Sequence, residues 1–224
     1  MPNNIYSRQI PLWGEEGQEK LMKSSIAIVG CGGLGGFLIE ILARTGVGRI
    51  LAIDPEVFEE SNLNRQILSK ISNIGKSKAE EAYIRVREIN PEVQLLPLRV
   101  SLSEENAQKL ISGVDVVVDA LDNIPSRRTL VRAACSLGIP VVHGAVHGWW
   151  GRICVVRKEE TLKKLYPEGV KAPEVIPAIA PVVALTAGYQ ACEVLKLLLK
   201  LGNPLENKLL MIDALEGEIF IVNL

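Results

Sequence analysis

The chain has 224 residues, of which 48% are hydrophobic and 23% charged, the profile of a globular protein with enough residues for a substantial core. Its 25 Lys and Arg residues nearly balance 26 Asp and Glu residues, so no basic field favours nucleic acid as a partner. The N-terminus is polar, unlike a secretion signal, and the four cysteines are scattered like reduced thiols, so we expect a cytoplasmic protein.

The sequence predicts one domain in three consecutive parts, residues 1–25, 26–156 and 157–224. In the first part, residues 5–13 are expected to form an arm, and a short helix follows it as far as Met22. No repeat or low-complexity linker separates this part from the next.

The middle part begins with an apolar run at residues 26–30, which is typical of a strand buried on both faces, and a helical pattern follows at residues 34–45. Further strands are expected at residues 49–54, 93–100, 114–120, 140–144 and 151–156, and further helices at residues 76–89, 104–111 and 125–137. This alternation predicts a Rossmann-like α/β fold, doubly wound, with a mostly parallel central sheet.

The last part begins with a polar segment without a clear pattern, residues 157–175. A long helix is predicted at residues 179–201, and the alternating residues 209–222 indicate a hairpin that extends the sheet in antiparallel fashion. The helix is apolar enough to cross a membrane, but Glu193 and Lys196 within it favour a buried core helix. We therefore expect no membrane partner.

A glycine-rich loop, Gly30-Cys31-Gly32-Gly33-Leu34-Gly35, joins the first predicted strand to a helix. Glycines allow a tight turn and let phosphates approach backbone N–H groups, and the helix dipole favours their negative charge. Asp54 ends the next strand, where an acid can accept hydrogen bonds from a ribose. These features predict a nucleotide-binding core over residues 26–156, although a glycine turn can also serve helix–strand packing alone. The loop does not distinguish NAD from ATP.

The segment Ser61-Asn62-Leu63-Asn64-Arg65-Gln66 favours a nucleoside triphosphate, whose phosphates need donors beyond the glycine loop. Asn62 offers an amide and Arg65 a planar fork, and Lys78 at the start of the next helix can add a second cation. Asn62 and Gln66 can alternatively be turn residues that bond to their own backbone.

Two acids lie at the predicted strand of residues 114–120. Asp122 falls just beyond the strand, at the edge where doubly wound sheets bind ligands, and can hold Mg²⁺ against a triphosphate. Asp119 lies within the strand and is expected to be structural. His143 and His147 make a poor metal site by themselves, so core or surface positions are expected for them.

With these motifs in place, the sequence resembles the ubiquitin-activating-enzyme-like adenylyltransferases, the family of MoeB, ThiF and HesA. Four blocks, in the same order over nearly the whole chain, carry the resemblance: Tyr6-Ser7-Arg8-Gln9-Ile10, residues 30–36, residues 61–66, and Leu121-Asp122-Asn123 with Arg127. Asn123 and Arg127 are otherwise typical of a helix start and of a surface.

The resemblance implies an ATP site made of Gly30, Gly32, Gly33, Gly35, Asp54, Asn62, Arg65, Lys78 and Asn123. It implies that Arg65, Lys78 and Asp122 act in catalysis, with Mg²⁺ on Asp122. Arg8 is similar to an arginine that reaches into the neighbouring subunit's site, which implies a homodimer. The implied partner is a small ubiquitin-like sulfur-carrier protein whose Gly-Gly tail is adenylylated, and we expect residues 147–150 to line the channel for that tail.

The sequence departs from the family in its cysteines. Many relatives bind a structural zinc through two Cys-x-x-Cys pairs, but residues 157–199 contain only Cys192, so no zinc is predicted. Residues 158–175 contain no cysteine that could accept the carrier as a thioester. Cys135, Cys154 and Cys192 are expected in the core, and Cys31 is expected to be a small loop residue, although a helix N-terminus can lower a thiol pKa. The reaction is therefore expected to stop at the adenylate.

Three other functions remain open at this point. One is a family branch that dehydrates a threonylcarbamoyl-modified tRNA adenosine with ATP, which the near-neutral charge disfavours. Another is an NAD-dependent oxidoreductase, which Asn62, Arg65 and Asp122 disfavour. The last is a non-catalytic partner subunit, against which the retained ATP-site residues argue.

Overall fold

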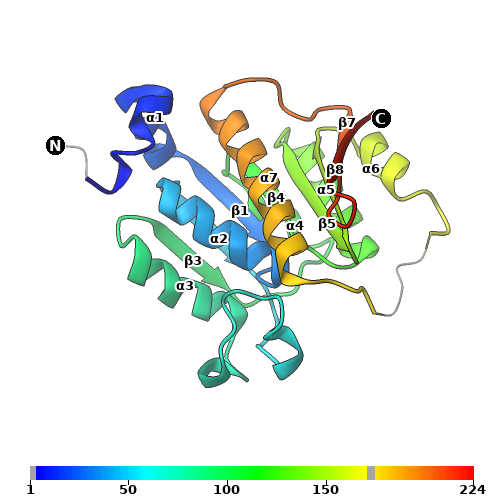
Figure 1. Cartoon of the computed structure of the whole chain (residues 1–224), viewed down its shortest axis with the longest axis horizontal. Helices are drawn as coiled ribbons and strands as arrows, with labels where there is room; N and C mark the ends of the chain where they lie inside the picture. The colour runs from blue at the N-terminus through cyan, green and yellow to red at the C-terminus, as the bar shows by residue number, and fades with distance from the viewer. Residues whose placement is uncertain (1–3, 171–174) are drawn as a thin grey trace.

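A single eight-stranded sheet forms the centre of the computed structural model, which describes residues 4–170 and 175–224 (Figure 1). Its strand order is β3-β2-β1-β4-β5-β6-β7-β8. The strands are β1 (Ser25–Val29), β2 (Arg49–Ile53), β3 (Gln94–Leu98), β4 (Val116–Asp119), β5 (Val141–His147), β6 (Trp150–Val156), β7 (Lys208–Asp213) and β8 (Glu218–Asn223). Neighbours from β3 to β5 pair in parallel, and the pairs from β5 to β8 are antiparallel. The predicted fold class, with its C-terminal antiparallel extension, is confirmed.

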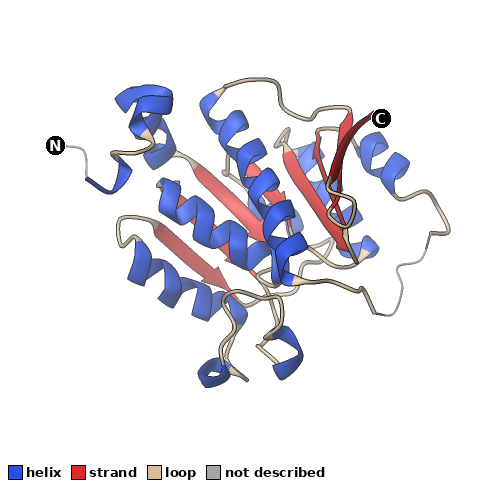
Figure 2. Ribbon diagram, in the orientation of Figure 1, coloured by secondary structure: helices blue, strands red, loops and turns tan. Residues whose placement is uncertain are grey.

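Helices cover both faces of the sheet (Figure 2). They are α1 (Ile10–Lys23), α2 (Gly33–Thr45), α3 (Lys78–Ile89), α4 (Ala107–Ile111), α5 (Ile124–Ser136), α6 (Glu159–Leu165) and α7 (Ala180–Leu199), with short 3-10 turns η1 (Asn4–Tyr6), η2 (Glu60–Asn62) and η3 (Ile71–Asn73). One layer contains α2, α3 and α7, and the other contains α4, α5 and α6. The layers explain why β1 is apolar after Ser25: Ile26 and Ile28 pack under the first layer, and Ala27 and Val29 under the second.

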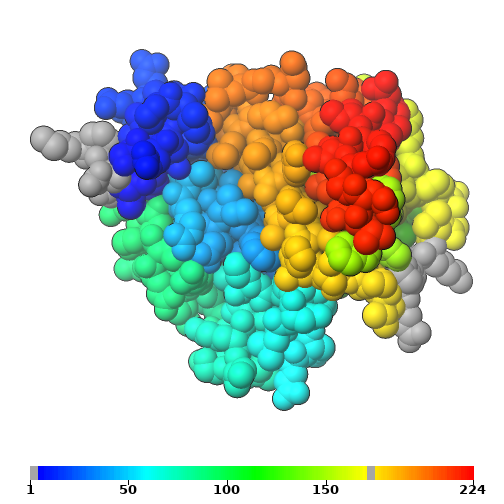
Figure 3. Space-filling view, in the orientation of Figure 1, coloured from blue at the N-terminus to red at the C-terminus, as the bar shows by residue number. Residues whose placement is uncertain are grey.

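The long helix α7 is a core helix, as predicted. It is long and apolar enough to cross a membrane by composition, but it lies across β4, β5 and β6 and packs against α2. Figure 3 shows α7 in orange between the N-terminal helix in dark blue and the C-terminal strand in red.

Three element predictions need correction. The N-terminal arm is shorter than expected, because α1 begins at Ile10 and is kinked at Gly14, whose φ is 74°. The polar segment after residue 156 contains α6, which has acids in its first turn and lysines in its last turn and buries Leu162. Strand β5 continues to His147, because it pairs with β6 over its whole length.

The strand order reverses at β1: β2 and β3 are added on one side of β1, and β4 and β5 on the other. Strand β1 pairs with β2 on one side and β4 on the other, and the helices that follow β1 and β4 lie in opposite layers. A crevice opens beyond the carboxyl ends of strands that diverge in this way, and ligands bind there in α/β sheets. The topology therefore fixes where a site should be sought.

Candidate active site

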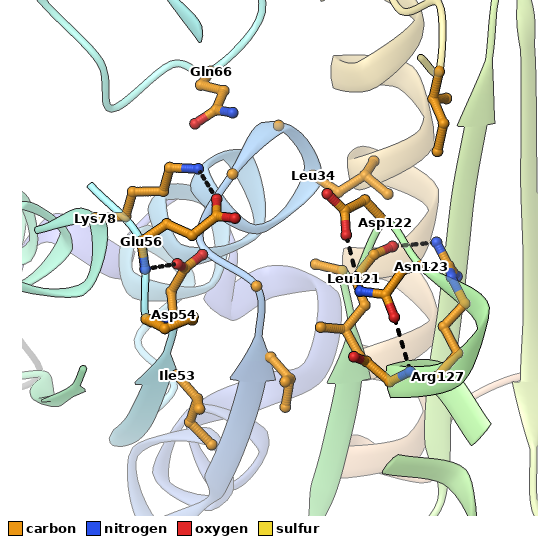
Figure 4. A pocket seen from close by; sticks show the side chains of 18 of the residues that line it. Leu34, Ile53, Asp54, Glu56, Gln66, Lys78, Leu121, Asp122, Asn123 and Arg127 are labelled. Atoms are coloured by element: carbon orange, nitrogen blue, oxygen red, sulfur yellow. Dashed lines mark hydrogen bonds and ion pairs between the residues drawn. The ribbon is translucent and has the colours of Figure 1, made fainter. Parts of the chain in front are cut away.

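A cavity of about 670 Å³ lies at this crevice (Figure 4). Its wall is formed by the glycine loop after β1, the segment after β2, the start of α3 and the loop between β4 and α5. All the predicted site residues except Gly35, Asn62 and Arg8 line it. The topology thus brings together three motifs that are far apart in sequence.

The glycine loop turns sharply into α2. Gly30 has a φ of 95°, and a Cβ there would lie 2.5 Å from the carbonyl oxygen of Ala120, just beyond the end of β4, so the position requires glycine. Gly32 and Gly33 line the cavity at the N-terminus of α2, where the first-turn N–H groups lack helical partners. Phosphate oxygens can accept from these groups.

Gly35 has a different role from the one predicted for it. It does not line the cavity, and a Cβ at this position would lie 2.7 Å from the carbonyl carbon of Gly30 and overlap its oxygen. Gly35 is therefore the packing glycine that lets α2 approach β1, and its assignment as an ATP-binding residue is corrected.

Asp54 follows β2 and lines the cavity while being almost fully buried. Its Oδ2 accepts the Cys31 N–H at 2.7 Å and its Oδ1 accepts the Glu56 N–H at 2.8 Å. Burial raises the pKa of Asp54, and these two hydrogen bonds and the nearby charge of Lys78 oppose the shift. The carboxylate is thus held rigidly beside the glycine loop, with lone pairs left to accept from a sugar hydroxyl.

Two cations, Arg65 and Lys78, line the cavity. Arg65 is partly exposed and is steadied by its own loop, since it donates to the Ser61 carbonyl at 2.8 Å and to Asn64 Oδ1 at 2.9 Å. Lys78 begins α3 and is buried, with its ammonium 2.6 Å from Glu56 Oε2. Both lysine and arginine line the cavity, as the sequence predicts.

The structure separates the two alternatives left open for Asn62 and Gln66. The Asn62 side chain turns into its own loop, where Oδ1 accepts the Glu59 N–H at 3.1 Å and Nδ2 donates to Ser61 Oγ at 3.3 Å. It does not line the cavity, so the turn alternative holds for Asn62. Gln66 does line it, and its buried Oε1 has no hydrogen-bond partner among the described residues. An unpartnered buried amide oxygen beside a cavity is free to accept a hydrogen bond from a ligand.

Asp122 and Asn123 form the rim beyond β4, and both are exposed. Asn123 caps α5, because its Oδ1 accepts the Ser126 N–H at 2.9 Å, and its Nδ2 donates to Asp122 Oδ1 at 3.2 Å. The helix-start reading of Asn123 is confirmed, and the same residue orients Asp122 at the cavity.

A buried polar network supports this rim from below. Arg127 donates to Asp119 Oδ2 at 3.0 Å, to the Gly144 carbonyl at 2.9 Å and to the Leu121 carbonyl next to Asp122. The surface alternative for Arg127 is therefore wrong, whereas Asp119 is structural as predicted. The burial of Arg127 could have been predicted from the sequence, because Arg127 shares one helix face with the buried Ile124, Leu130 and Val131.

His143 completes the network and is a core residue, as expected. Its Nδ1 lies 2.7 Å from Asp119 Oδ2 and 2.8 Å from Arg127 Nη1, and its Nε2 lies 3.3 Å from the Tyr166 hydroxyl. Burial raises the pKa of Asp119, but Arg127 and His143 outweigh it and hold that pKa below its ordinary value. Burial and the charge of Arg127 lower the pKa of His143, so its imidazole is neutral.

The ThiF family model matches residues 6–224 of this sequence. The chain belongs to the ThiF family. It is 39% identical over 220 residues to the SAMP-activating enzyme E1 of Haloferax volcanii, and the alignment covers 94% of this chain and 81% of that protein. It is 37% identical over 228 residues to the sulfur carrier protein adenylyltransferase of Thermus thermophilus, over 95% of this chain and 83% of the relative.

A third relative of this ThiF-family chain is the molybdopterin-synthase adenylyltransferase of Haemophilus influenzae, which is 34% identical over 96% of this chain and 91% of that protein. The fold also matches a crystal structure of E. coli MccB with ATP, with a TM-score of 0.84 and 25% identity over 99% of this chain and 71% of that one. A PaaA crystal structure matches the fold with a TM-score of 0.84, at 21% identity over 98% and 82% of the two chains. The family expected from the motifs is thus confirmed.

Arg8 of this ThiF-family chain lies far from its own cavity. Its neighbour Gln9 donates to the Thr45 carbonyl at the last turn of α2, and the glycine loop is at the first turn. A 13-residue helix is about 20 Å long, so Arg8 is on the amino-end side of the sheet and the cavity on the carboxyl-end side. Any catalytic role of Arg8 therefore requires a second copy of the chain.

The thiols give a mixed outcome. Burial raises the pKa of Cys31 and Cys135 and raises that of Cys154 to about 12, which excludes the lowered pKa considered for Cys31. Cys192 is exposed rather than in the core, because it lies on the outer side of α7. Within residues 4–170 and 175–224, no three His, Cys, Asp or Glu side chains gather as a metal site would require.

Proposed function

We propose that this chain uses ATP to adenylylate the C-terminal carboxylate of a small ubiquitin-like sulfur-carrier protein that ends in Gly-Gly. The observation that carries the proposal is the meeting, in one cavity, of the α2 N-terminus, Asp54, two cations and the rim carboxylate Asp122. The names of three relatives, two of them carrier or molybdopterin-synthase adenylyltransferases and one an activating E1, support the same reaction and substrate class.

Each wall of the cavity suits a different part of ATP. Asp54 accepts from the ribose, as its fixed carboxylate beside the glycine loop allows. The first-turn N–H groups of α2 face the phosphates, and the cations of Arg65 and Lys78 neutralise the outer phosphate oxygens. Gln66 lines the same cavity, where its Nε2 amide group can donate to a phosphate oxygen, while its unpartnered Oε1 can accept only from a donor such as a sugar hydroxyl.

The reaction needs charge neutralisation and alignment more than proton transfer. The carrier's terminal carboxylate is already ionised at neutral pH and attacks the α-phosphorus of ATP. A new carboxyl oxygen–phosphorus bond forms, the bond from the α-phosphorus to its bridging oxygen breaks, and pyrophosphate leaves with the electron pair. Arg65 and Lys78 stabilise the charge that builds on the departing phosphates. No cysteine thioester takes part in this scheme.

Magnesium is part of the proposal. Mg²⁺ prefers oxygen ligands, is commonly held by one or two carboxylates together with substrate phosphates, and keeps several waters. Asp122 supplies such a carboxylate, exposed on the cavity rim and oriented by Asn123. The bound ion would supply charge neutralisation for the triphosphate, and Asp122 would hold it at the rim.

A homodimer in the cytoplasm is the remaining part of the proposal. Arg8 cannot reach the cavity of its own chain, so its guanidinium would act in the cavity of a second copy. The hairpin tip at residues 147–150 would then line the path of the carrier's tail, since Val146 next to it lines the cavity.

Carrier-dependent exchange of labelled pyrophosphate into ATP tests the proposal. Purified chain should catalyse exchange with carriers that end in Gly-Gly and not with carriers truncated by those residues. Asp122→Ala or Arg65→Ala should lower the exchange rate by about two orders of magnitude, the usual cost of one preorganised group. Near-normal exchange in both variants, or exchange that needs no carrier, would sink the proposal.

Subunit sharing has its own test. Neither Arg8→Ala nor Asp122→Ala protein should be active alone, but a refolded mixture should regain part of the activity, because hybrid dimers contain one site with both residues intact. The control is a mixture of Arg8→Ala protein with Arg8→Ala/Asp122→Ala protein, which has no intact site in any pairing. Activity no higher than in that control would show that Arg8 is not shared.

A further inference from the structure

Glu56 occupies the position at the cavity where a phosphate would be expected to meet Lys78. Its Oε2 lies 2.6 Å from the Lys78 ammonium, and Figure 4 shows the pair facing the cavity beside Asp54. The two side chains differ in burial, because Lys78 is 5% exposed and Glu56 is 63% exposed. A hydrogen bond of 3.0 Å from the Lys78 N–H to the Glu56 carbonyl also fixes the two backbones to each other.

A buried ammonium needs a counter-charge whether or not a nucleotide is present, because an unpaired charge removed from water is strongly destabilising. Asp54 is the other acid nearby, but its two oxygens already accept the N–H groups of Cys31 and Glu56. The Glu56 carboxylate is the one that contacts the ammonium. A triphosphate brings several negative charges to the same ammonium, so it competes with Glu56 for it.

The exposure of Glu56 makes that competition easy to resolve. Its backbone is held by Asp54 and Lys78, whereas its side chain is mostly in solvent and can rotate away without uncovering any core. Lys78 has no such freedom, because α3 begins at this residue and its stem is buried.

We propose that Glu56 is an exchangeable counter-ion, a positioning residue that neutralises Lys78 in the nucleotide-free protein and gives it up to the phosphates of ATP. When pyrophosphate departs, Glu56 returns to Lys78 and so favours product release. This inference rests on the proposed use of ATP, and it adds a residue whose effect is to weaken anion binding rather than to strengthen it.

The test is isothermal titration of the full chain with ATP and, separately, with pyrophosphate, both in Mg²⁺. Glu56→Gln keeps the shape of the side chain but removes the charge, and it should bind both ligands about tenfold more tightly, because the anion that competes for the Lys78 ammonium is lost. The matched control is Glu60→Gln, an exposed acid in η2 that does not line the cavity, and its Kd should stay within about twofold.

A double-mutant cycle shows whether the effect passes through Lys78. In a Lys78→Met background, Glu56→Gln should change the Kd for pyrophosphate no more than Glu60→Gln does, because no ammonium remains to be contested. A lower KM for pyrophosphate in carrier-dependent exchange should accompany Glu56→Gln alone, and Glu60→Gln should leave that KM unchanged.

Several results would overturn the inference. It is wrong if Glu56→Gln binds pyrophosphate no more tightly than wild type, including the case in which neither protein binds it. A crystal structure of the wild-type chain with ATP decides the matter without variants: Glu56 should have left the ammonium, and a retained ion pair contradicts the proposal. Tight ATP binding with no carrier-dependent exchange would instead remove the proposed substrate and leave the role of Glu56 intact.

Discussion

Replacing Arg127 with methionine should destabilise the fold more than any change to an exposed arginine. Methionine fills much of the same space, but the guanidinium bonds to Asp119, the Gly144 carbonyl and the Leu121 carbonyl are lost. Asp119 is 0% exposed, so the change leaves a buried carboxylate without its cation. Breaking a buried ion pair in this way costs about 3–5 kcal/mol. In a chain of this length, that loss lowers the Tm by about 6–20 °C.

Urea unfolding at pH 7, followed by circular dichroism, measures this loss against Arg128→Met. Arg128 is the next residue, and its guanidinium donates at 3.1 Å to the Tyr166 carbonyl without contacting a buried charge. Arg128→Met should lower the free energy of unfolding by about 1 kcal/mol or less. Asp119→Asn in the Arg127→Met background removes the unpaired charge and should recover part of the loss. Equal, small losses for Arg127→Met and Arg128→Met would refute the buried-charge argument.

Two further predictions concern buried polar groups near the cavity. Gln66→Leu removes an amide whose Oε1 lacks a partner among the described residues. The free energy of unfolding should therefore stay within about 1 kcal/mol of wild type, while the affinity for ATP should fall. Unchanged ATP affinity would show that Gln66 does not contact the nucleotide. His143→Gln should flatten the pH dependence of stability. Because the pKa of His143 is lowered in the folded protein, the unfolded chain binds an extra proton below about pH 6.5. The free energy of unfolding of wild type therefore falls there by up to about 1.4 kcal/mol per pH unit, and that of the variant does not. Parallel stability curves from pH 7 to pH 5 would contradict a neutral buried His143.

The fold could be predicted from sequence because its main signals are local. Strand β1 is apolar from Ile26 to Val29 because helices cover both of its faces, and the glycine loop that follows marks the turn into α2. Segment α6 was missed for the opposite reason. It buries little beyond Leu162, so its apolar periodicity is weak, and only the charges at its two ends indicate a helix.

The site residues divide along the same line. Asp54, Arg65, Lys78 and Asp122 follow directly from motifs, and the structure brings all four to one cavity. The role of Glu56 does not follow from the sequence, because three acids lie in the segment after Asp54. Only the folded structure, in which Glu56 contacts Lys78 22 residues further along the chain, shows which of the three meets the lysine. Asn62 and Gln66 are both amides on the same loop, and only the path of the 3-10 turn η2 decides which one faces the cavity.

Two ion pairs flank the cavity, and their burial separates a fixed side from an adjustable one. On the β4 side, Asp119 and Arg127 are 0% and 6% exposed, so neither can leave without stranding the other, and the backbone next to Asp122 stays where Arg127 holds it. On the β2 side, the partner of Lys78 is largely in solvent and can leave at little cost. In the proposed reaction a triphosphate arrives and a diphosphate departs, so the cation that binds the phosphates is released and recaptured in each cycle, whereas Asp122, the proposed Mg²⁺ ligand, stays aligned throughout. The distribution of burial between the two pairs meets both requirements.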